Sequence, residues 1–244
     1  MPEALLLLSK ALFAAAGCGA GVRLAQIARR EGGVPLHAWG CAMVFAGGFG
    51  LLGFGIGPTL AKTAPDLARA VMIVGDGLGR VVTAALTVFV WRVFGAGSGG
   101  RRALLTALFA AMAVNWVRGL LHQSWPEPTP PLQRFENQLV LALPFVWSAL
   151  ETRLAFGRSR LQLALGLTDA VTSNRFLLWS LASACFASIG FAAAAAAVAP
   201  RDSSLAAALV VLQALLFVVI AAIVSLAFFP PAAYLRWLAG APAR

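Results

Sequence analysis

Seven apolar stretches, each long enough to cross a lipid bilayer, constrain the fold of this chain more than any other feature. A bilayer crossing takes about 20 mostly apolar residues in a helix, because every backbone polar group must be hydrogen-bonded within the segment. The stretches predict membrane spans at 4–25, 36–60, 66–92, 101–122, 132–156, 174–198 and 204–229. We therefore predict an all-α polytopic membrane protein, with one seven-helix transmembrane domain over residues 1–244.

The composition excludes an ordinary soluble domain. Of the 244 residues, 60% are hydrophobic and 11% are charged, whereas a soluble domain carries about 25% charged residues. The net charge of +10 lies in short groups between the apolar stretches and not on one face, so we predict no nucleic-acid partner. The excess of arginine over lysine is typical of a GC-rich bacterium, and we expect the protein in the inner (plasma) membrane.

The basic residues predict the orientation of the spans. Cytoplasmic loops are enriched in arginine and lysine. The connections after spans one, three and five hold Arg23, Arg29, Arg30, Arg92, Arg101, Arg102, Arg153, Arg158 and Arg160. The tail adds Arg236 between Tyr234 and Trp237, a basic and aromatic group typical of the membrane interface. We predict that the N-terminus lies outside and the C-terminus in the cytoplasm.

Helix 66–92 carries two ionisable residues near mid-membrane depth, Asp76 and Arg80. Their spacing of four residues places them one above the other on one helix face, as an ion pair. Because charged groups inside a membrane face protein or water, we expect this helix to be central. The alternative interpretation is that the ion pair has only a structural role, in which the two charges neutralise each other.

Polar residues on four other predicted spans fall at outer-half depth. If their faces converge with that of helix 66–92, they line a polar cavity that opens outward, with Asp76 and Arg80 as its floor. The predicted ligand-binding residues are Asp76, Arg80, Asn115, Arg118, His122, Glu136, Gln138, Lys10 and Gln213. For several of these, a position at the membrane interface is the competing interpretation.

The sequence indicates no catalytic, metal or cofactor site. The only histidines, His37 and His122, are predicted on opposite sides of the membrane, which opposes a zinc or haem site. The three cysteines lie in apolar stretches without metal-binding spacing. The last span, 204–229, has no lysine for a retinal Schiff base.

Glycine and proline predict the packing of the spans. The pairs Gly53/Gly57 and Gly75/Gly79 have the four-residue spacing that lets membrane helices approach closely, so we expect the second and third spans to pack together. Pro144 predicts a kink in the fifth span.

The connection after the fifth span is the longest. Its apolar residues, within 157–173, predict a short helix on the membrane surface. Ser173 or Asn174 is the expected N-cap of the next span.

The segments 166–171 and 174–179 resemble a stretch of uncharacterised bacterial seven-helix membrane proteins. That resemblance implies no activity. The span count and orientation are similar to those of seven-helix receptors and rhodopsins, which implies a receptor-like layout.

These observations favour a membrane protein that binds a small or lipid-derived anion in the outer-half cavity, as a sensor or receptor. The expected partners are membrane lipid, that ligand, and a signalling protein in the membrane or cytoplasm. One alternative is a proton-coupled transporter that uses Asp76 and Arg80. Further alternatives are a lipid-modifying enzyme, although no catalytic residue is indicated, and an assembly factor.

Overall fold

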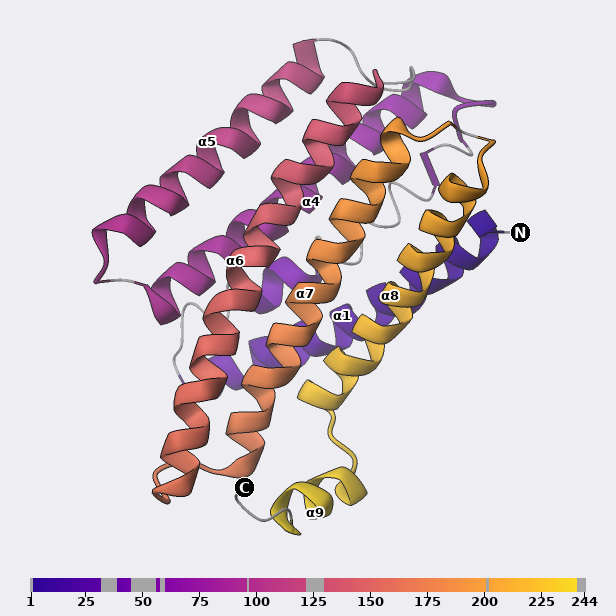
Figure 1. Cartoon of the computed structure of the whole chain (residues 1–244). Helices are drawn as coiled ribbons and strands as arrows, with labels where there is room; N and C mark the ends of the chain where they lie inside the picture. Colours follow the sequence, from indigo (N-terminus) through magenta and orange to yellow (C-terminus); the bar gives the residue numbers. More distant parts are fainter. Residues whose placement is uncertain are drawn as a thin grey trace.

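A computed structural model of the chain describes residues 2–31, 39–44, 56–57, 60–95, 97–121, 130–200 and 202–240. No strand occurs among these residues, and the predicted all-α class is confirmed for them. The long helices are α1 (Pro2–Glu31), α4 (Pro65–Phe94), α5 (Gly99–Leu121), α6 (Pro131–Ala164), α7 (Ala170–Val198) and α8 (Ser204–Phe228), followed by the short α9 (Ala232–Gly240) (Figure 1).

Six helices in the described part of the chain are long and apolar enough to cross a membrane, namely α1, α4, α5, α6, α7 and α8. They overlap the first and the third to seventh predicted spans. Most of the predicted second span, 36–60, lies outside the described residues. Length and composition thus indicate a multi-pass membrane protein, while the count of seven and the orientation stay predictions.

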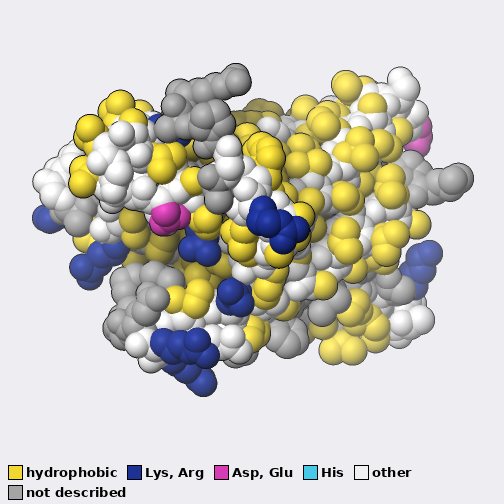
Figure 2. Space-filling view, turned by 90° about the horizontal axis from the view of Figure 1, so that it is seen from below, with side chains coloured by type: hydrophobic (Ala, Val, Ile, Leu, Met, Phe, Trp, Pro, Cys, Tyr) yellow, Lys and Arg dark blue, Asp and Glu magenta, His cyan; other side chains and the backbone are white. Residues whose placement is uncertain are grey.

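The antiparallel pair of α6 and α7 lies at the centre of the described bundle. Helices α4 and α5 pack on α6, and α8 packs between α7 and α1 (Figure 1). We call the end where α5 stops and α6 starts the α5–α6 end, and the opposite one the α6–α7 end. Figure 2, which looks at the α6–α7 end, shows more basic than acidic side chains among the hydrophobic ones, the side predicted to be cytoplasmic.

Small residues allow α6 and α7 to approach closely. The hydroxyls of Ser148 and Ser183 are hydrogen-bonded across the pair at 2.9 Å. Near the α5–α6 end, a Cβ added to Gly190 would lie 2.6 Å from the Cβ of Ala142, which is closer than carbon atoms can approach. The absence of a side chain at position 190 therefore sets the distance between the helices.

We expect Gly190→Leu to lower the free energy of unfolding by about 1–3 kcal/mol, the usual cost of forcing extra volume into a packed interior. The matched control is Gly157→Leu on α6, because Gly157 is exposed and a Cβ there meets no atom within 4 Å. This control gains helix propensity and should not destabilise. Thermal unfolding in detergent measures both variants. Equal melting temperatures for the two would contradict the packing argument.

The prediction of a separate surface helix within 157–173 is wrong. Helix α6 continues without interruption to Ala164, because the only weak helix former after its apolar part is a single glycine, whose cost is only about 1 kcal/mol. The helix ends in a C-terminal glycine motif. Gly166 has a positive φ of 70°, and the N–H groups of Gly166 and Leu167 donate to the carbonyls of Leu163 and Gln162 at 3.1 and 2.8 Å.

The N-cap of α7 is also earlier than predicted. Asp169, and not Ser173 or Asn174, caps the helix. Its carboxylate accepts hydrogen bonds from the backbone N–H and the hydroxyl of Thr172, at 2.8 and 2.7 Å. The hydroxyl bond and then the backbone bond hold the pKa of the Asp169 carboxyl below its usual value.

A partly buried ion pair connects the first turn of α5 to the middle of α6. Arg101 Nε lies 2.8 Å from Oε1 of Glu151, and Arg101 Nη2 donates to Oε2 at 2.9 Å. The same guanidinium donates to the carbonyl of Phe94 at the end of α4, at 2.7 Å. Trp147 Nε1 adds a hydrogen bond to Glu151 at 3.2 Å. These contacts join the end of α4 and the start of α5 to α6.

Candidate functional site

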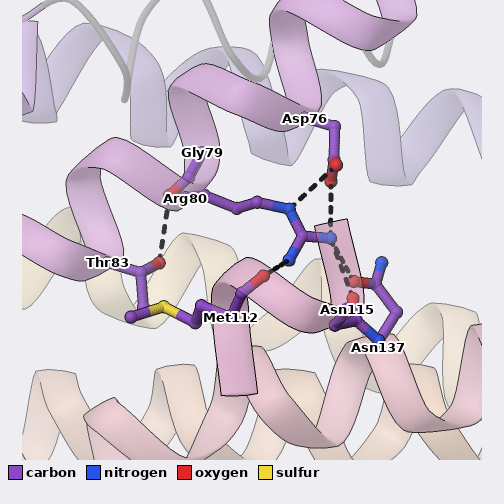
Figure 3. A network of polar contacts seen from close by, with 7 residues as sticks. All are labelled: Asp76, Gly79, Arg80, Thr83, Met112, Asn115 and Asn137. Carbon is purple, nitrogen blue, oxygen red and sulfur yellow. Dashed lines mark hydrogen bonds and ion pairs between the residues drawn. The ribbon is translucent and has the colours of Figure 1, made fainter. Parts of the chain in front are cut away.

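Arg80 is the centre of a buried polar network that joins α4, α5 and α6 (Figure 3). Its Nε donates to Asp76 Oδ2 at 2.9 Å, and its Nη1 donates to the Met112 carbonyl at 3.2 Å. Its Nη2 donates to the side-chain oxygens of Asn115, at 3.1 Å, and Asn137. Only 4% of Asp76 and 9% of Arg80 is exposed.

The predicted Asp76–Arg80 ion pair is therefore confirmed, and α4 is central in the sense that its charges contact two neighbouring helices. Both carboxylate oxygens of Asp76 face the guanidinium, at 2.9 and 3.5 Å. The pair contributes no net charge to its surroundings. Through Arg80 the pair joins α4 to α5 and α6, and an unpaired charge at this depth would be costly.

A cavity of about 690 Å³ touches this network. The described residues that line it come from α1, α4, α5, α6, α7 and α8 and from the 39–44 segment. Six predicted site residues are among them: Lys10, Asp76, Arg80, Asn115, Gln138 and Gln213. Most of the other described lining residues are apolar, so the cavity is less polar than predicted.

Two predicted site residues lie apart from the cavity lining. Arg118 Nη1 lies 2.9 Å from Glu136 Oε2 in an ion pair between α5 and α6. The two side chains are 49% and 37% exposed, so this pair belongs to the surface of the α5–α6 end. A third predicted residue, His122, lies outside the described residues.

Four phenylalanines line the cavity at one level and contact one another: Phe13, Phe145, Phe186 and Phe217. We call this group the aromatic layer. Phe186 is at its centre, with ring centroids 5.1 Å from Phe13, 4.8 Å from Phe145 and 6.5 Å from Phe217. All four line the cavity. Because the layer contains one residue from each of α1, α6, α7 and α8, it fixes the register of these helices.

This register places polar side chains at a second level of the cavity, one or two helical turns from the aromatic layer toward the α5–α6 end. We call this level the polar layer. Lys10, Gln138 and Gln213 precede the phenylalanine of their own helix by three, seven and four residues. Asn137, beside Gln138, connects this layer to Arg80 through its side-chain oxygen. The polar side chains therefore gather at one level of the cavity.

Beyond the aromatic layer, toward the α6–α7 end, the cavity is lined mostly by apolar side chains, and the hydroxyl of Ser183 in this part is bonded to Ser148. The apolar side chains include Leu86, Trp179, Val224 and Phe228. Trp179 lies 6.2 Å from Phe228 between ring centroids, so aromatic rings form much of this wall. We call this part the apolar compartment.

The two basic side chains in the lining besides Arg80 have few partners. Lys10 forms no hydrogen bond or ion pair with any described residue. Arg134 Nη2 donates to the Ala197 carbonyl at 3.4 Å, while its buried Nε has no acceptor among the described residues. Arg134 was not among the predicted site residues, although it lies within the predicted span 132–156. Its spacing of four residues from Gln138, on the same face of α6, was the available signal.

Gly75 and Gly79 of α4 were predicted to pack against the second span, most of which lies outside the described residues. Gly75 and Gly79 line the cavity, and a Cβ added to Gly79 would meet no atom within 4 Å. The lack of a side chain at position 79 leaves space in the cavity, while the packing of the second span on Gly75 stays a prediction. Gly57 does contact α4, where an added Cβ would collide with Met72, whereas Gly53 lies outside the described residues.

Comparison with protein-family models, with curated proteins and with solved structures gave no match. Among the described residues, no group of three or more histidine, cysteine or acidic side chains is placed to hold a metal ion. The functional argument therefore depends on the cavity and its charges.

Proposed function

We propose that this membrane protein binds a lipid-derived anion in the cavity, as a sensor or receptor. The observation that carries the proposal is that one cavity connects a polar layer to an apolar compartment, and that two basic side chains of the polar end have no charge partner among the described residues. An amphiphile with a negative head group and a hydrocarbon chain fits this division. The volume of about 690 Å³ lies in the range of small-molecule sites, about 300–1,000 Å³.

The net charge of the described lining supports a negative ligand. The charged lining residues are Lys10, Arg80 and Arg134, which are basic, and Asp76, which is acidic. Since Asp76 neutralises Arg80, two positive charges are left for a ligand. A low-dielectric wall strengthens their attraction for an anion.

The length of the cavity supports a chain rather than a small polar ion. Lining residues on α8 extend from Gln213 to Phe228, a rise of about 22 Å for a helix. The hydrocarbon part of one bilayer leaflet is about 15 Å thick. A lipid chain that leaves the polar layer can therefore stay in contact with apolar side chains over its length.

A proton-coupled transporter is a weaker proposal than a sensor or receptor. A proton carrier needs a carboxyl group that protons can reach, whereas Asp76 is buried and both of its carboxylate oxygens are bonded to Arg80. A sensor or receptor needs only that ligand binding changes the relative position of helices on the two sides of the cavity. The signalling partner in the membrane or cytoplasm remains part of this proposal.

The test uses hexadecanoate as the probe and the full chain in phosphatidylcholine nanodiscs. We expect hexadecanoate to raise the melting temperature of the wild type and of Gly157→Leu. It should leave Gly79→Leu unchanged, because a leucine at position 79 projects into the cavity whereas one at position 157 meets open space. Stabilisation of Gly79→Leu equal to that of the wild type would show that the probe binds elsewhere and overturn the proposal.

A separate measurement distinguishes a receptor from a carrier. In proteoliposomes, a receptor binds hexadecanoate without accelerating its transfer across the bilayer. Acceleration that Asp76→Asn abolishes would favour the transporter instead.

A further inference from the structure

We propose that the head group of the ligand is a phosphate ester, and that Lys10 on α1 and Arg134 on α6 hold it at the polar layer. This inference rests on the proposed function, since it assigns the chemical class of the anion that the cavity takes. Lys10 and Arg134 form no ion pair with any other described residue.

Lys10 supplies the first contact. It lies one turn from Phe13 on the cavity face of α1, and its ammonium has three donors and no described partner. A lysine that only balanced a charge of the protein would be placed beside a carboxylate. The acidic residue in the described lining, Asp76, is already bonded to Arg80.

Arg134 supplies the second contact. Its only hydrogen bond to a described residue is the long one to Ala197, and its Nε is buried without an acceptor. Buried donors in native proteins are nearly always satisfied, and a guanidinium binds phosphate oxygens through two parallel N–H groups. An anion at the polar layer would provide the missing acceptor.

The arrangement of these donors favours phosphate over carboxylate. Arg134 is four residues before Gln138, so it lies about 6 Å farther along α6 than the polar layer. Lys10 approaches from α1, and Gln138 and Gln213 add amide groups from α6 and α8. A carboxylate presents two oxygens in one plane, whereas a phosphate monoester presents three oxygens in different directions and carries more than one negative charge near neutral pH. A phosphate can therefore accept hydrogen bonds from donors on three helices with a separate oxygen for each, and its larger charge matches two basic side chains.

Arg80 does not replace either residue in this role. Its Nε and Nη2 groups already face Asp76, Asn115 and Asn137 (Figure 3). A ligand that contacted Nε or Nη2 would have to displace these partners. The unpaired cations are therefore the recognition groups, and Arg80 holds the polar layer in place.

The test compares three probes with the same chain, namely hexadecyl phosphate, hexadecanoate and hexadecanol, in phosphatidylcholine nanodiscs. We expect hexadecyl phosphate to bind the wild type about tenfold or more tightly than hexadecanoate. Lys10→Met and Arg134→Met should each weaken the phosphate about 10- to 100-fold, the usual value of a charge-assisted hydrogen bond. Neither should change the affinity for hexadecanol.

The matched control is Arg118→Met, which removes a cation from the same end of the bundle but outside the cavity lining; we expect unchanged phosphate affinity. Equal binding of phosphate and carboxylate, or phosphate binding unaffected by Lys10→Met and Arg134→Met, would overturn the head-group assignment. If hexadecanol and hexadecanoate still bind and Gly79→Leu blocks them, the proposed function stands. If none of the three probes binds the wild type, both fail. Melting curves of each variant without probe show that it is folded.

Discussion

Replacing Arg80 with methionine is expected to lower the free energy of unfolding by about 3–5 kcal/mol, the cost of leaving a buried charge without its partner. Asp76 is 4% exposed, and Arg80 provides the hydrogen bonds of both carboxylate oxygens. The variant also frees the Met112 carbonyl and the oxygens of Asn115 and Asn137. Unfolding by titration with dodecyl sulfate, followed by helical circular dichroism, measures the loss.

The double variant Asp76→Asn/Arg80→Met separates charge from packing. Removing both charges eliminates the uncompensated carboxylate, so we expect this variant to recover most of the stability that Arg80→Met loses. Arg118→Met is the control, since its partner Glu136 is partly exposed and surface pairs contribute only about 0–1 kcal/mol. A double variant as unstable as Arg80→Met would show that the hydrogen bonds of the guanidinium, and not its charge, stabilise the network.

The same variants test whether the pair is structural or takes part in ligand recognition. If Arg80 only positions the polar layer, the double variant should still bind hexadecyl phosphate through Lys10 and Arg134, with a modest loss. A complete loss of binding in a folded double variant would assign a direct contact to Arg80.

Local spacing in the sequence was sufficient to predict the parts of the site that depend on one helix. The four-residue separation of Asp76 and Arg80 determines their contact, because it is set by helix geometry. The depth of Lys10, Gln138 and Gln213 followed in the same way from the number of residues between each of them and the ends of its span. These residues indeed line one cavity.

Contacts between helices could not be derived from spacing within one helix. Arg118 and Glu136 have the right depth for the cavity, but they face each other across α5 and α6 at its edge. The aromatic layer was not predicted either, because phenylalanine in a membrane span is as compatible with lipid as with a cavity wall. Whether a phenylalanine faces lipid or the cavity depends on how four helices are aligned with one another, and the sequence alone does not determine that alignment.

The ends of helices were predictable in principle from signals that were not used. Gly166 occupies the position after a helix end where a left-handed conformation is needed, and Asp169 has the short acceptor side chain of an N-cap. Read together, they place the turn between α6 and α7 at 165–169. Hydrophobicity alone placed it earlier, since the arginines within 153–160 resemble the end of a span.

The buried carboxylate of Glu151 gives the second large expected effect. We expect Arg101→Met to lower the free energy of unfolding by about 3 kcal/mol, at the lower end of the range for a broken buried pair, because the Arg101 side chain is 31% exposed and water can reach the site. The loss includes the hydrogen bond to the carbonyl of Phe94. Arg102→Met is the matched control, because the structure gives its side chain no ion pair or hydrogen bond to a described residue.

Hydrogen exchange provides the local readout for this pair. Because Arg101 connects the end of α4 to α6, its loss should increase amide exchange in the last turn of α4 and the first turn of α5 more than in α8. Arg101→Met/Glu151→Gln removes the unpaired charge and should recover stability but not the slow exchange, since the contact between the α4–α5 turn and α6 stays broken. Recovery of both would show that the pair matters only through its charge, and slow exchange in Arg101→Met itself would show that other contacts hold the turn.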